Sequence, residues 1–383
     1  MKCLRYFLAL VIVSAFSSPV CSTGIEEERG SPLQTVASYT GDVAWSATGG
    51  LRRGTGWLGM AAMNASLNTG QAGLWKNGTF AVSAAYTHGA TPSLDLFGDA
   101  QVSSNIEAGN RFFLMELWIR QRFGDVELTA GLQDLNSVFA VSESGGLYLN
   151  SSFGINPVLS GNIQAPIFPL TSPGLTAIWQ ISGSGSLAGA LFDGRPLPFE
   201  MNPYNTRWKL ERGDGLLALV EYRLQSEIRG MKGEYRFGIF SHSHIIERVI
   251  DPDLSDMPCS ATVGGYAMAD RQVWASGSRE ANLFIQAAFS PSSESVTDLS
   301  WALGTNIKGL VRDRSDDVAG IALTSVRFTG YSGVETAIEL TYRAQINRII
   351  FLQPDVQYII NPSGRESMTP HCLACFLRVG VKL

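Results

Sequence analysis

The segment that decides the fold runs from Val334 to Ile346 and reads VETAIELTYRAQI. Its side chains alternate between two faces, a period of two that predicts a β-strand. One face carries Glu335, Glu339, Thr341, Arg343 and Gln345, and the other carries Val334, Ile338, Leu340, Tyr342, Ala344 and Ile346. The same pattern returns at the end of the chain, in Leu377, Val379 and Val381. A strand that is polar on one face and apolar on the other is typical of a transmembrane barrel.

The first residues predict export from the cytoplasm. Lys2 and Arg5 precede an apolar run from Tyr6 to Phe16, and small residues follow. This order is typical of a cleaved signal peptide, which we expect to cover residues 1–22. We expect residues 23–35 to form a periplasmic N-terminal segment and residues 36–383 to form the barrel.

The composition favours a sheet that faces a membrane. The chain holds 40 glycines and only 16% charged residues, which is unusual for a soluble protein of this length. Residues 144–192 lack Asp, Glu, Lys and Arg, but repeated prolines and glycines exclude a membrane-spanning helix there. A membrane protein without spanning helices must be a closed barrel. The net charge of −5, with both signs interspersed, argues against a nucleic-acid partner.

Alternation recurs along the whole mature chain and predicts sixteen antiparallel strands, with the first and last strands paired to close the barrel. A turn at Asn77-Gly78 separates two of them, because Asn and Gly tolerate a positive φ. The expected strands are residues 37–46, 57–68, 79–87, 112–122, 126–133, 174–182, 187–192, 214–224, 233–245, 265–275, 281–290, 298–308, 317–328, 334–345, 348–359 and 372–383.

Connection lengths alternate between long and short. The long connections 88–111, 134–173, 193–213, 246–264 and 360–371 all fall at one end, which we expect to be extracellular. The other end carries shorter turns, including 123–125, 183–186 and 225–232. Aromatic residues such as Trp45, Trp57 and Tyr86 lie near strand ends, where interfacial girdles are expected.

Several runs of sequence resemble the carbohydrate-selective porin family, often called OprB-like. They include Gly49-Gly50-Leu51-Arg52-Arg53-Gly54-Thr55, Val102-Ser103-Ser104-Asn105-Ile106-Glu107-Ala108, Glu116-Leu117-Trp118, Leu149-Asn150-Ser151-Ser152-Phe153-Gly154, Phe192-Asp193-Gly194, Gly213-Asp214-Gly215, Ala269-Asp270 and Gln353-Pro354-Asp355-Val356-Gln357-Tyr358-Ile359-Ile360-Asn361-Pro362. Together these runs cover nearly the whole mature chain in order.

The resemblance implies a sixteen-stranded outer-membrane barrel through which carbohydrates diffuse without a cofactor. It also implies contact with outer-membrane lipid and lipopolysaccharide, and either a homotrimer or a monomer. Two features depart from the family pattern. The chain ends in Leu383 where such barrels typically end in an aromatic residue, and the charge-free stretch 144–192 leaves in doubt the usual charged lining of that loop.

The polar face of the strands supplies candidate residues for binding sugar. A sugar offers hydroxyl groups around an apolar ring face, so charged groups beside a flat aromatic ring suit it. Residues 112–122 place Glu116, Trp118 and Arg120 on one face, with Phe113 and Met115 on the other. The alternative for Trp118 is that it only fills space against a folded loop. The closing strands add four further inward candidates, Glu335, Glu339, Arg343 and Asp355.

Loop residues are candidates for the pore constriction. In the family interpretation, inward-folded loops narrow the pore, and Arg52, Arg53, Asn105 and Glu107 lie at the bases of such loops. The alternative is that they are ordinary exposed loop residues. Lumen charges of both signs favour neutral solutes over strong ion selectivity.

The remaining reactive residues suggest neither catalysis nor a metal site. His242 and His244 share a strand face, but no third ligand is evident nearby. Cys372 and Cys375 should point to opposite faces of the last strand, and whether Cys259 pairs with either stays open. The competing functions are a barrel enzyme, for which no partnered Ser or Asp with His is evident, a non-transporting structural barrel, and a less selective porin for ions and small solutes.

Overall fold

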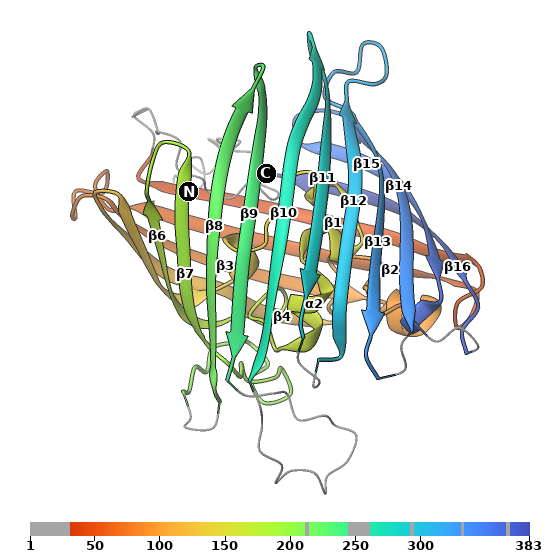
Figure 1. The fold of residues 1–383 in the computed structure, drawn as a ribbon, viewed down its shortest axis with the longest axis horizontal. Coiled ribbons are helices and arrows are strands. Elements are labelled where there is room, and N and C mark those ends of the chain that lie inside the picture. Colours follow the sequence, from red (N-terminus) through yellow and green to blue (C-terminus); the bar gives the residue numbers. More distant parts are fainter. Residues whose placement is uncertain (1–30, 211–213, 244–260, 292–294, 331–332, 365–367) are drawn as a thin grey trace, which may run out of the picture.

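The computed structural model describes residues 31–210, 214–243, 261–291, 295–330, 333–364 and 368–383 of the 383-residue chain. Within these residues, sixteen antiparallel strands form one closed barrel in sequence order (Figure 1). The strands are β1 (Leu33–Thr48), β2 (Gly54–Asn68), β3 (Gly78–Gly89), β4 (Arg111–Phe123), β5 (Val126–Gln133), β6 (Ser172–Gln180), β7 (Gly185–Asp193), β8 (Leu216–Ile228), β9 (Met231–His242), β10 (Thr262–Ser276), β11 (Arg279–Phe289), β12 (Thr297–Lys308), β13 (Val318–Phe328), β14 (Val334–Gln345), β15 (Ile350–Ile360) and β16 (Cys372–Lys382).

Each expected strand is confirmed, with small changes at its ends. β1 begins at Leu33, three residues before the expected start of the barrel at residue 36. β8 and β9 extend until only Arg229 and Gly230 separate them, whereas we expected a turn over 225–232; both residues have positive φ, 56° and 75°. Asn77 has φ 64°, as its turn requires. Residues 1–22, which we expect to be a signal peptide, and Cys259 lie outside the described residues.

The barrel closes through an ion pair at its seam. β1 pairs with β16 from Ser38↔Lys382 to Thr48↔Leu373, which places Asp42 directly opposite Arg378. The Arg378 Nε and Nη2 atoms donate to the two Asp42 carboxylate oxygens at 2.7 and 2.8 Å. Both side chains are buried inside the barrel, so the pair joins the first strand to the last where water is scarce.

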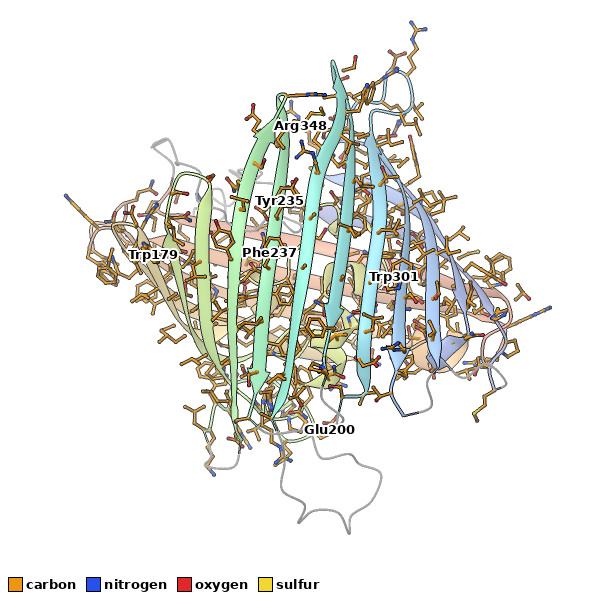
Figure 2. All side chains as sticks on the ribbon, in the orientation of Figure 1. Trp179, Glu200, Tyr235, Phe237, Trp301 and Arg348 are labelled. Carbon is orange, nitrogen blue, oxygen red and sulfur yellow. The ribbon has the colours of Figure 1, made fainter. Side chains whose placement is uncertain are left out.

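Strand alternation sorts side chains between lipid and interior as the sequence predicts. On β14, Leu340 points outward and is 59% exposed, while Glu335 and Glu339 point inward and are fully buried. The outer surface is apolar around the barrel, with side chains such as Phe237 and Trp301 standing away from the strands (Figure 2). No helix among the described residues is long and apolar enough to cross a membrane.

The packed core lies inside the barrel, between its wall and two long connections. The connection 134–171 carries η2 (Leu135–Ser137), η3 (Gly145–Leu147), α1 (Ser151–Gly154) and α2 (Pro157–Asn162). Its Phe139 and Leu159 pack against Phe240 and Tyr266 of the wall. The connection 90–110 carries η1 (Ser93–Phe97) and packs against Phe376 and other wall residues. The short helical turn η5 (Pro362–Gly364) lies in the connection between β15 and β16.

Candidate functional site

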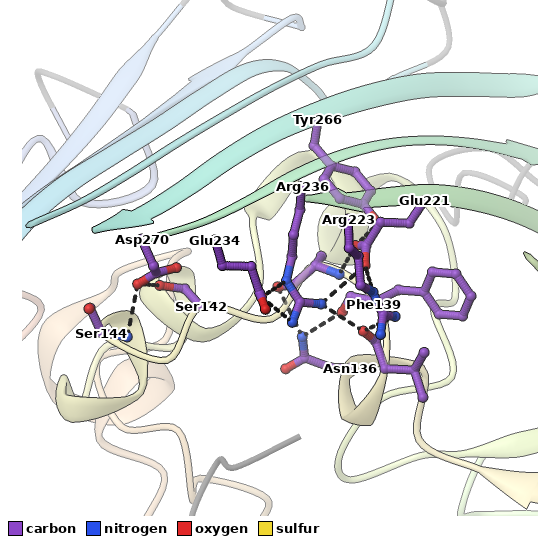
Figure 3. Close-up of polar contacts among 12 residues, drawn as sticks. Asn136, Phe139, Ser142, Ser144, Glu221, Arg223, Glu234, Arg236, Tyr266 and Asp270 are labelled. Carbon is purple, nitrogen blue, oxygen red and sulfur yellow. Dashed lines mark hydrogen bonds and ion pairs between the residues drawn. The ribbon is translucent and has the colours of Figure 1, made fainter. Parts of the chain in front are cut away.

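The connection 134–171, which carries no Asp, Glu, Lys or Arg after Glu143, is held inside the barrel by charged residues of the wall. Figure 3 shows Glu221, Arg223, Arg236 and Tyr266, from β8, β9 and β10, around the backbone of this connection. The Ala140 N–H donates to Glu221 Oε2 at 2.8 Å, and Tyr266 OH donates to the same oxygen at 2.8 Å. The guanidinium groups of Arg223 and Arg236 donate to the Val138 carbonyl at 2.8 and 3.0 Å.

Two further wall carboxylates bind the same connection at its middle. Glu339 accepts the Leu149 and Asn150 N–H groups at 2.6 and 3.0 Å. Asp270 Oδ1 accepts Ser144 N–H and Ser142 Oγ–H, both at 3.0 Å (Figure 3). A carboxylate that accepts backbone N–H groups in a protein interior makes a strong, charge-assisted bond. The wall therefore supplies the charges that hold the middle of the connection inside the barrel.

The base of the connection is closed by Asp134. Its two oxygens accept Asn136 N–H at 2.8 Å and Phe168 N–H at 3.2 Å, which joins the beginning of the connection to its end. Its own N–H donates to Glu116 Oε1 at 3.3 Å. Burial, and then the charge of Glu116, raises the pKa of Asp134 to about 7.

The connection 90–110 docks on β14 and β1 of the wall by the same chemistry. Glu335 accepts Ala100 N–H at 2.8 Å and Gln101 N–H at 3.0 Å. Ser104 Oγ donates to Asp42 at 2.7 Å, which ties this connection to the ion pair at the barrel seam. Both long connections therefore narrow the barrel from inside.

A polar cavity of about 900 Å³ lies beside connection 134–171, toward the short-turn end of the barrel. It is lined by charged residues of both signs and by amide side chains. The charged residues are Glu143, Glu227, Lys232, Glu234, Asp270, Arg271, Glu280, Lys308, Asp316 and Arg343, and the amides are Gln225, Gln272, Asn282, Asn306 and Gln345. Burial, and then the charges of Asp270, Glu234 and Glu280, raises the pKa of Glu143 on the loop.

The four inward candidates of the closing strands divide into two groups. Arg343 lines the cavity, with its guanidinium carbon 3.8 Å from the centre of the Phe351 ring. Glu335 and Glu339 are inward but fully buried, because they accept backbone N–H groups of the two connections. Asp355 is also buried and accepts Gln357 Nε2–H at 3.2 Å. These three carboxylates contact protein rather than open space.

Strand β4 has a bulge that the alternation pattern did not reveal. Ser83 pairs with Glu116 and Ala84 with Leu114, so Met115 is an extra residue and the inward face changes from even to odd positions. Phe113 therefore points inward and is fully buried, which corrects its expected position on the outer face. Trp118 and Arg120 lie inward together, with the Arg120 guanidinium 4.6 Å from the Trp118 ring centre. Arg120 also pairs with Glu127 at 3.3 Å.

The four loop candidates do not gather at one constriction. Arg52 and Arg53 are exposed, and Arg52 Nε donates to the Asp95 carbonyl at 3.0 Å. Asn105 is exposed and donates from Nδ2 to the Tyr148 carbonyl at 3.3 Å, linking the two long connections. Glu107 accepts Ser93 N–H at 3.2 Å, and burial, aided by Asp99 and Asp95, raises its pKa to about 7.

Most residues that line the cavity were missed by the sequence analysis. Lys308, Asn306 and Glu143 stand in no recognisable motif, and Asp270 appeared only as part of the Ala269-Asp270 run. Glu143 lies 127 positions before Asp270, and only the folding of the loop into the barrel brings them together. A signal was available in the charged and amide side chains of β9 to β12, which supply much of the lining.

The thiols and histidines do not form a reactive centre in the described part of the chain. Cys372 is buried inside and Cys375 is partly exposed on the opposite face; both are free thiols. His242 Nε2 lies 2.7 Å from the Gly194 carbonyl, while His244 falls outside the described residues. No group of three or more His, Cys, Asp or Glu side chains among the described residues is arranged to hold a metal ion.

Comparisons with known proteins define the class of this barrel. The model of the carbohydrate-selective porin, OprB family, matches residues 52–383, so the chain belongs to that family. The high-pH structure of Pseudomonas putida OprB superposes with a TM-score of 0.83 at 19% identity, covering 92% of this chain and 94% of that one. The low-pH structure of the same protein gives a TM-score of 0.59 at 17% identity, covering 92% and 93%.

A more distant barrel shares the fold. The loop L8 deletion mutant of Vibrio cholerae OmpT, an outer-membrane protein, gives a TM-score of 0.56 at 7% identity, covering 92% of this chain and 99% of that one. A search of curated protein sequences finds no match. The family and the fold are those of a non-enzymatic carbohydrate porin of the outer membrane, as the sequence analysis expected.

Proposed function

We propose that carbohydrates diffuse passively through this barrel, along connection 134–171 and through the adjoining cavity. The observation that carries the proposal is the lining of the cavity, where five amide side chains stand among six acidic and four basic ones. Amides and ions of both signs offer donors and acceptors to the hydroxyl groups of a sugar in any orientation. Their mixture attracts no single ion strongly, which favours neutral solutes.

The residues that we propose to contact the sugar come from two places. Arg343 and Glu143 face the cavity from the wall and from the loop. Trp118 and Arg120, with Glu116 and Glu127 nearby, form a flat ring beside charged groups, a surface on which a sugar ring can stack. Arg52 and Arg53 are proposed to meet the solute only at the mouth of the long-loop end.

The placement of the chain in the outer membrane is also part of the proposal. We infer that residues 1–22 are removed on export, that residues 23–35 begin on the periplasmic side, and that the long-loop end faces the medium. Exposed outer-face aromatics such as Trp45, Trp57 and Tyr86 suit the boundary with lipid and lipopolysaccharide.

Liposome swelling with a series of sugars of rising size tests the proposal. Vesicles that hold the purified protein should swell in monosaccharide solutions and progressively less in larger oligosaccharides. The double variant Asn282→Leu with Gln272→Leu should reduce monosaccharide flux several-fold, because it removes cavity amides without touching the bonds that hold the loop. Asn347→Leu, outside the cavity at a short turn, serves as the matched control.

The competing functions predict different results in the same system. A less selective porin is the main alternative, since charges of both signs also admit small ions and other solutes. It predicts equal rates for sugars and amino acids of the same size. A non-transporting barrel predicts no swelling and no conductance in planar bilayers, and either result would contradict the proposal.

A further inference from the structure

One side of the cavity collects carboxylates that have no basic partner. Asp270 on β10 and Glu280 on β11 line it from the wall, and Glu143 lines it from connection 134–171. None of these three forms an ion pair with any residue that the structure describes. Asp270 also stands directly opposite Glu234 of β9, and Arg236 pairs with Glu234 only (Figure 3). This side of the cavity is therefore negatively charged, at the cost in stability that opposed like charges impose.

A second part of the wall carries basic groups without acidic partners. Arg343 on β14 lines the cavity, and Lys382 on β16 lies close enough for the two positive charges to repel each other. Neither forms an ion pair within the described part of the chain. The Phe351 ring, on which Arg343 lies, leans over Gly380, where a Cβ would stand 1.9 Å from a ring carbon. The wall thus holds this guanidinium in place without a carboxylate to neutralise it.

The acidic and the basic side are separated around the barrel. In the order of the sheet, β12 and β13 lie between β11 and β14. At about 4.8 Å per strand, the way along the wall from β14 is about 14 Å to β11 and about 19 Å to β10. Lys308 and Lys232 border the acidic side, opposite Glu280 and Glu227 in the register. Opposite charges kept apart across one cavity produce an electric field between its two sides.

A buried amide with a free oxygen lies on β12, between the two sides. Asn306 lines the cavity, is only 8% exposed, and donates from Nδ2 to the Ser144 carbonyl at 2.8 Å. Its Oδ1 atom accepts no hydrogen bond from the described residues. A buried amide oxygen without a partner calls for a donor from outside the chain. Asn282 stands directly opposite it on β11, so hydroxyl groups of a solute meet amides between the charged sides.

We propose that the cavity favours zwitterionic sugars, which carry one ammonium and one carboxylate group, over uncharged sugars of the same size. The field turns the ammonium toward Asp270 and Glu280 and the carboxylate toward Arg343, while the amides receive the hydroxyl groups. The advantage grows with the distance between the two charges of the solute, because the interaction of a dipole with a field scales with that distance. The inference rests on the proposed function, since it requires that sugars pass through this cavity, and it names a substrate class for it.

Liposome swelling with three solutes of matched size tests the inference. The solutes are glucitol, 2-amino-2-deoxygluconic acid and 6-amino-6-deoxygluconic acid, which share a six-carbon chain and have no net charge at pH 7. Each acid carries one positive and one negative charge at this pH. The two acids are isomers that differ in the distance between these charges. The 6-amino acid should enter several-fold faster than glucitol, and the 2-amino acid should enter at an intermediate rate.

Two double variants remove the field from either side. Glu143→Gln with Glu280→Gln neutralises the acidic side, and Arg343→Gln with Lys382→Gln neutralises the basic side. Each should bring the ratio of 6-amino acid flux to glucitol flux close to one. Asp298→Asn with Arg327→Gln is the matched control, because it also removes two charges, from a pair that is not part of the cavity lining, and should keep the wild-type ratio. Heat-modifiable migration on gels confirms that each variant is a folded barrel.

The possible outcomes separate this inference from the proposed function. Equal flux of glucitol and both acids would overturn the inference and leave passive sugar transport standing. A preference for the 6-amino acid that persists in both neutralised variants would overturn it as well, because its source would then lie outside these side chains. Swelling with none of the three solutes would overturn the inference together with the proposed function.

Discussion

Arg343 was predicted from the sequence to face inward, and it lines the cavity of the structure. Of the eleven candidate side chains from the sequence, it alone lines the cavity, and it faces an interior that also contains Glu143 of the loop. Its stacking on Phe351 holds the guanidinium at one position against the wall. Arg343 and Glu143 carry opposite charges at the same cavity, so they suit a paired test of how charge acts on solutes.

Neutralising Arg343 and neutralising Glu143 should change the ion preference of the channel in opposite directions. Arg343→Gln should raise the ratio of cation to anion permeability about twofold, and Glu143→Gln should lower it by a similar factor, because each removes one charge from a shared space. Reversal potentials in a salt gradient across planar bilayers measure both changes. Shifts of the same sign would show that neither side chain faces the ion path.

Glu107 should make the docking of connection 90–110 depend on pH. Its pKa is about 7 in the folded chain against an ordinary value of 4.5, because burial disfavours the charged form. The folded loop therefore binds the proton more tightly than the unfolded one, so docking loses stability as pH rises from about 4.5 to about 7.

Single-channel recordings can detect this loss as more frequent current fluctuations at pH 8 than at pH 5. Glu107→Gln, which keeps the shape and cannot ionise, should show a smaller difference between the two pH values. A wild-type channel and a variant with identical pH responses would place the titrating group elsewhere.

At the scale of elements, we expect the bonds between wall and loop to set the width of the pore. Glu339→Ala leaves the Leu149 and Asn150 N–H groups without partners, at a cost of about 1–3 kcal/mol for each. Connection 134–171 should then loosen, and both conductance and the size limit for sugars should rise. Asp298→Ala is the control, because that carboxylate pairs with Arg327 of the neighbouring strand. Unchanged conductance would mean that the remaining bonds suffice to hold the loop.

The seam between β1 and β16 should be far more sensitive to mutation than an exposed ion pair. Arg378→Ala leaves Asp42 buried without its partner, and we expect a loss of about 3–5 kcal/mol in stability. Arg327→Ala removes a pair with Asp298 that is half exposed and should cost less than about 1 kcal/mol. The temperature at which the folded band disappears in heat-modifiability gels compares the two. Equal losses would contradict a special role for the seam.

The bulge in β4 is a feature of a strand that the alternation pattern did not predict. Alternation placed all sixteen strands, because lipid outside and polar groups inside impose a period of two on each. A single extra residue at Met115 then exchanged the faces above it and brought Phe113 inward. The bulge depends on how β4 pairs with β3, which the sequence of β4 alone does not contain.

For the whole molecule, the two ends of the barrel should lie on opposite sides of the membrane. In a variant without native cysteines, Leu94→Cys lies at the long-loop end and Asp313→Cys lies at the short-turn end, both well exposed. A maleimide reagent too large for the pore should label position 94 in intact cells and position 313 only after lysis. The reverse labelling pattern would show that the barrel has the opposite orientation in the membrane.

The sequence by itself determined the architecture and the family: sixteen strands, long connections at one end, and runs of residues shared with carbohydrate-selective porins. These features follow from local patterns, because the alternation of apolar and polar side chains in each strand shows which face meets lipid. The tertiary structure alone decided what the inward charges do. Glu335, Glu339 and Asp355 were expected in the lumen and are buried, the first two against backbone N–H groups of connections distant in sequence. A carboxylate on a strand has the same sequence signature whether it faces water or a docked loop, and only the path of the loop distinguishes them.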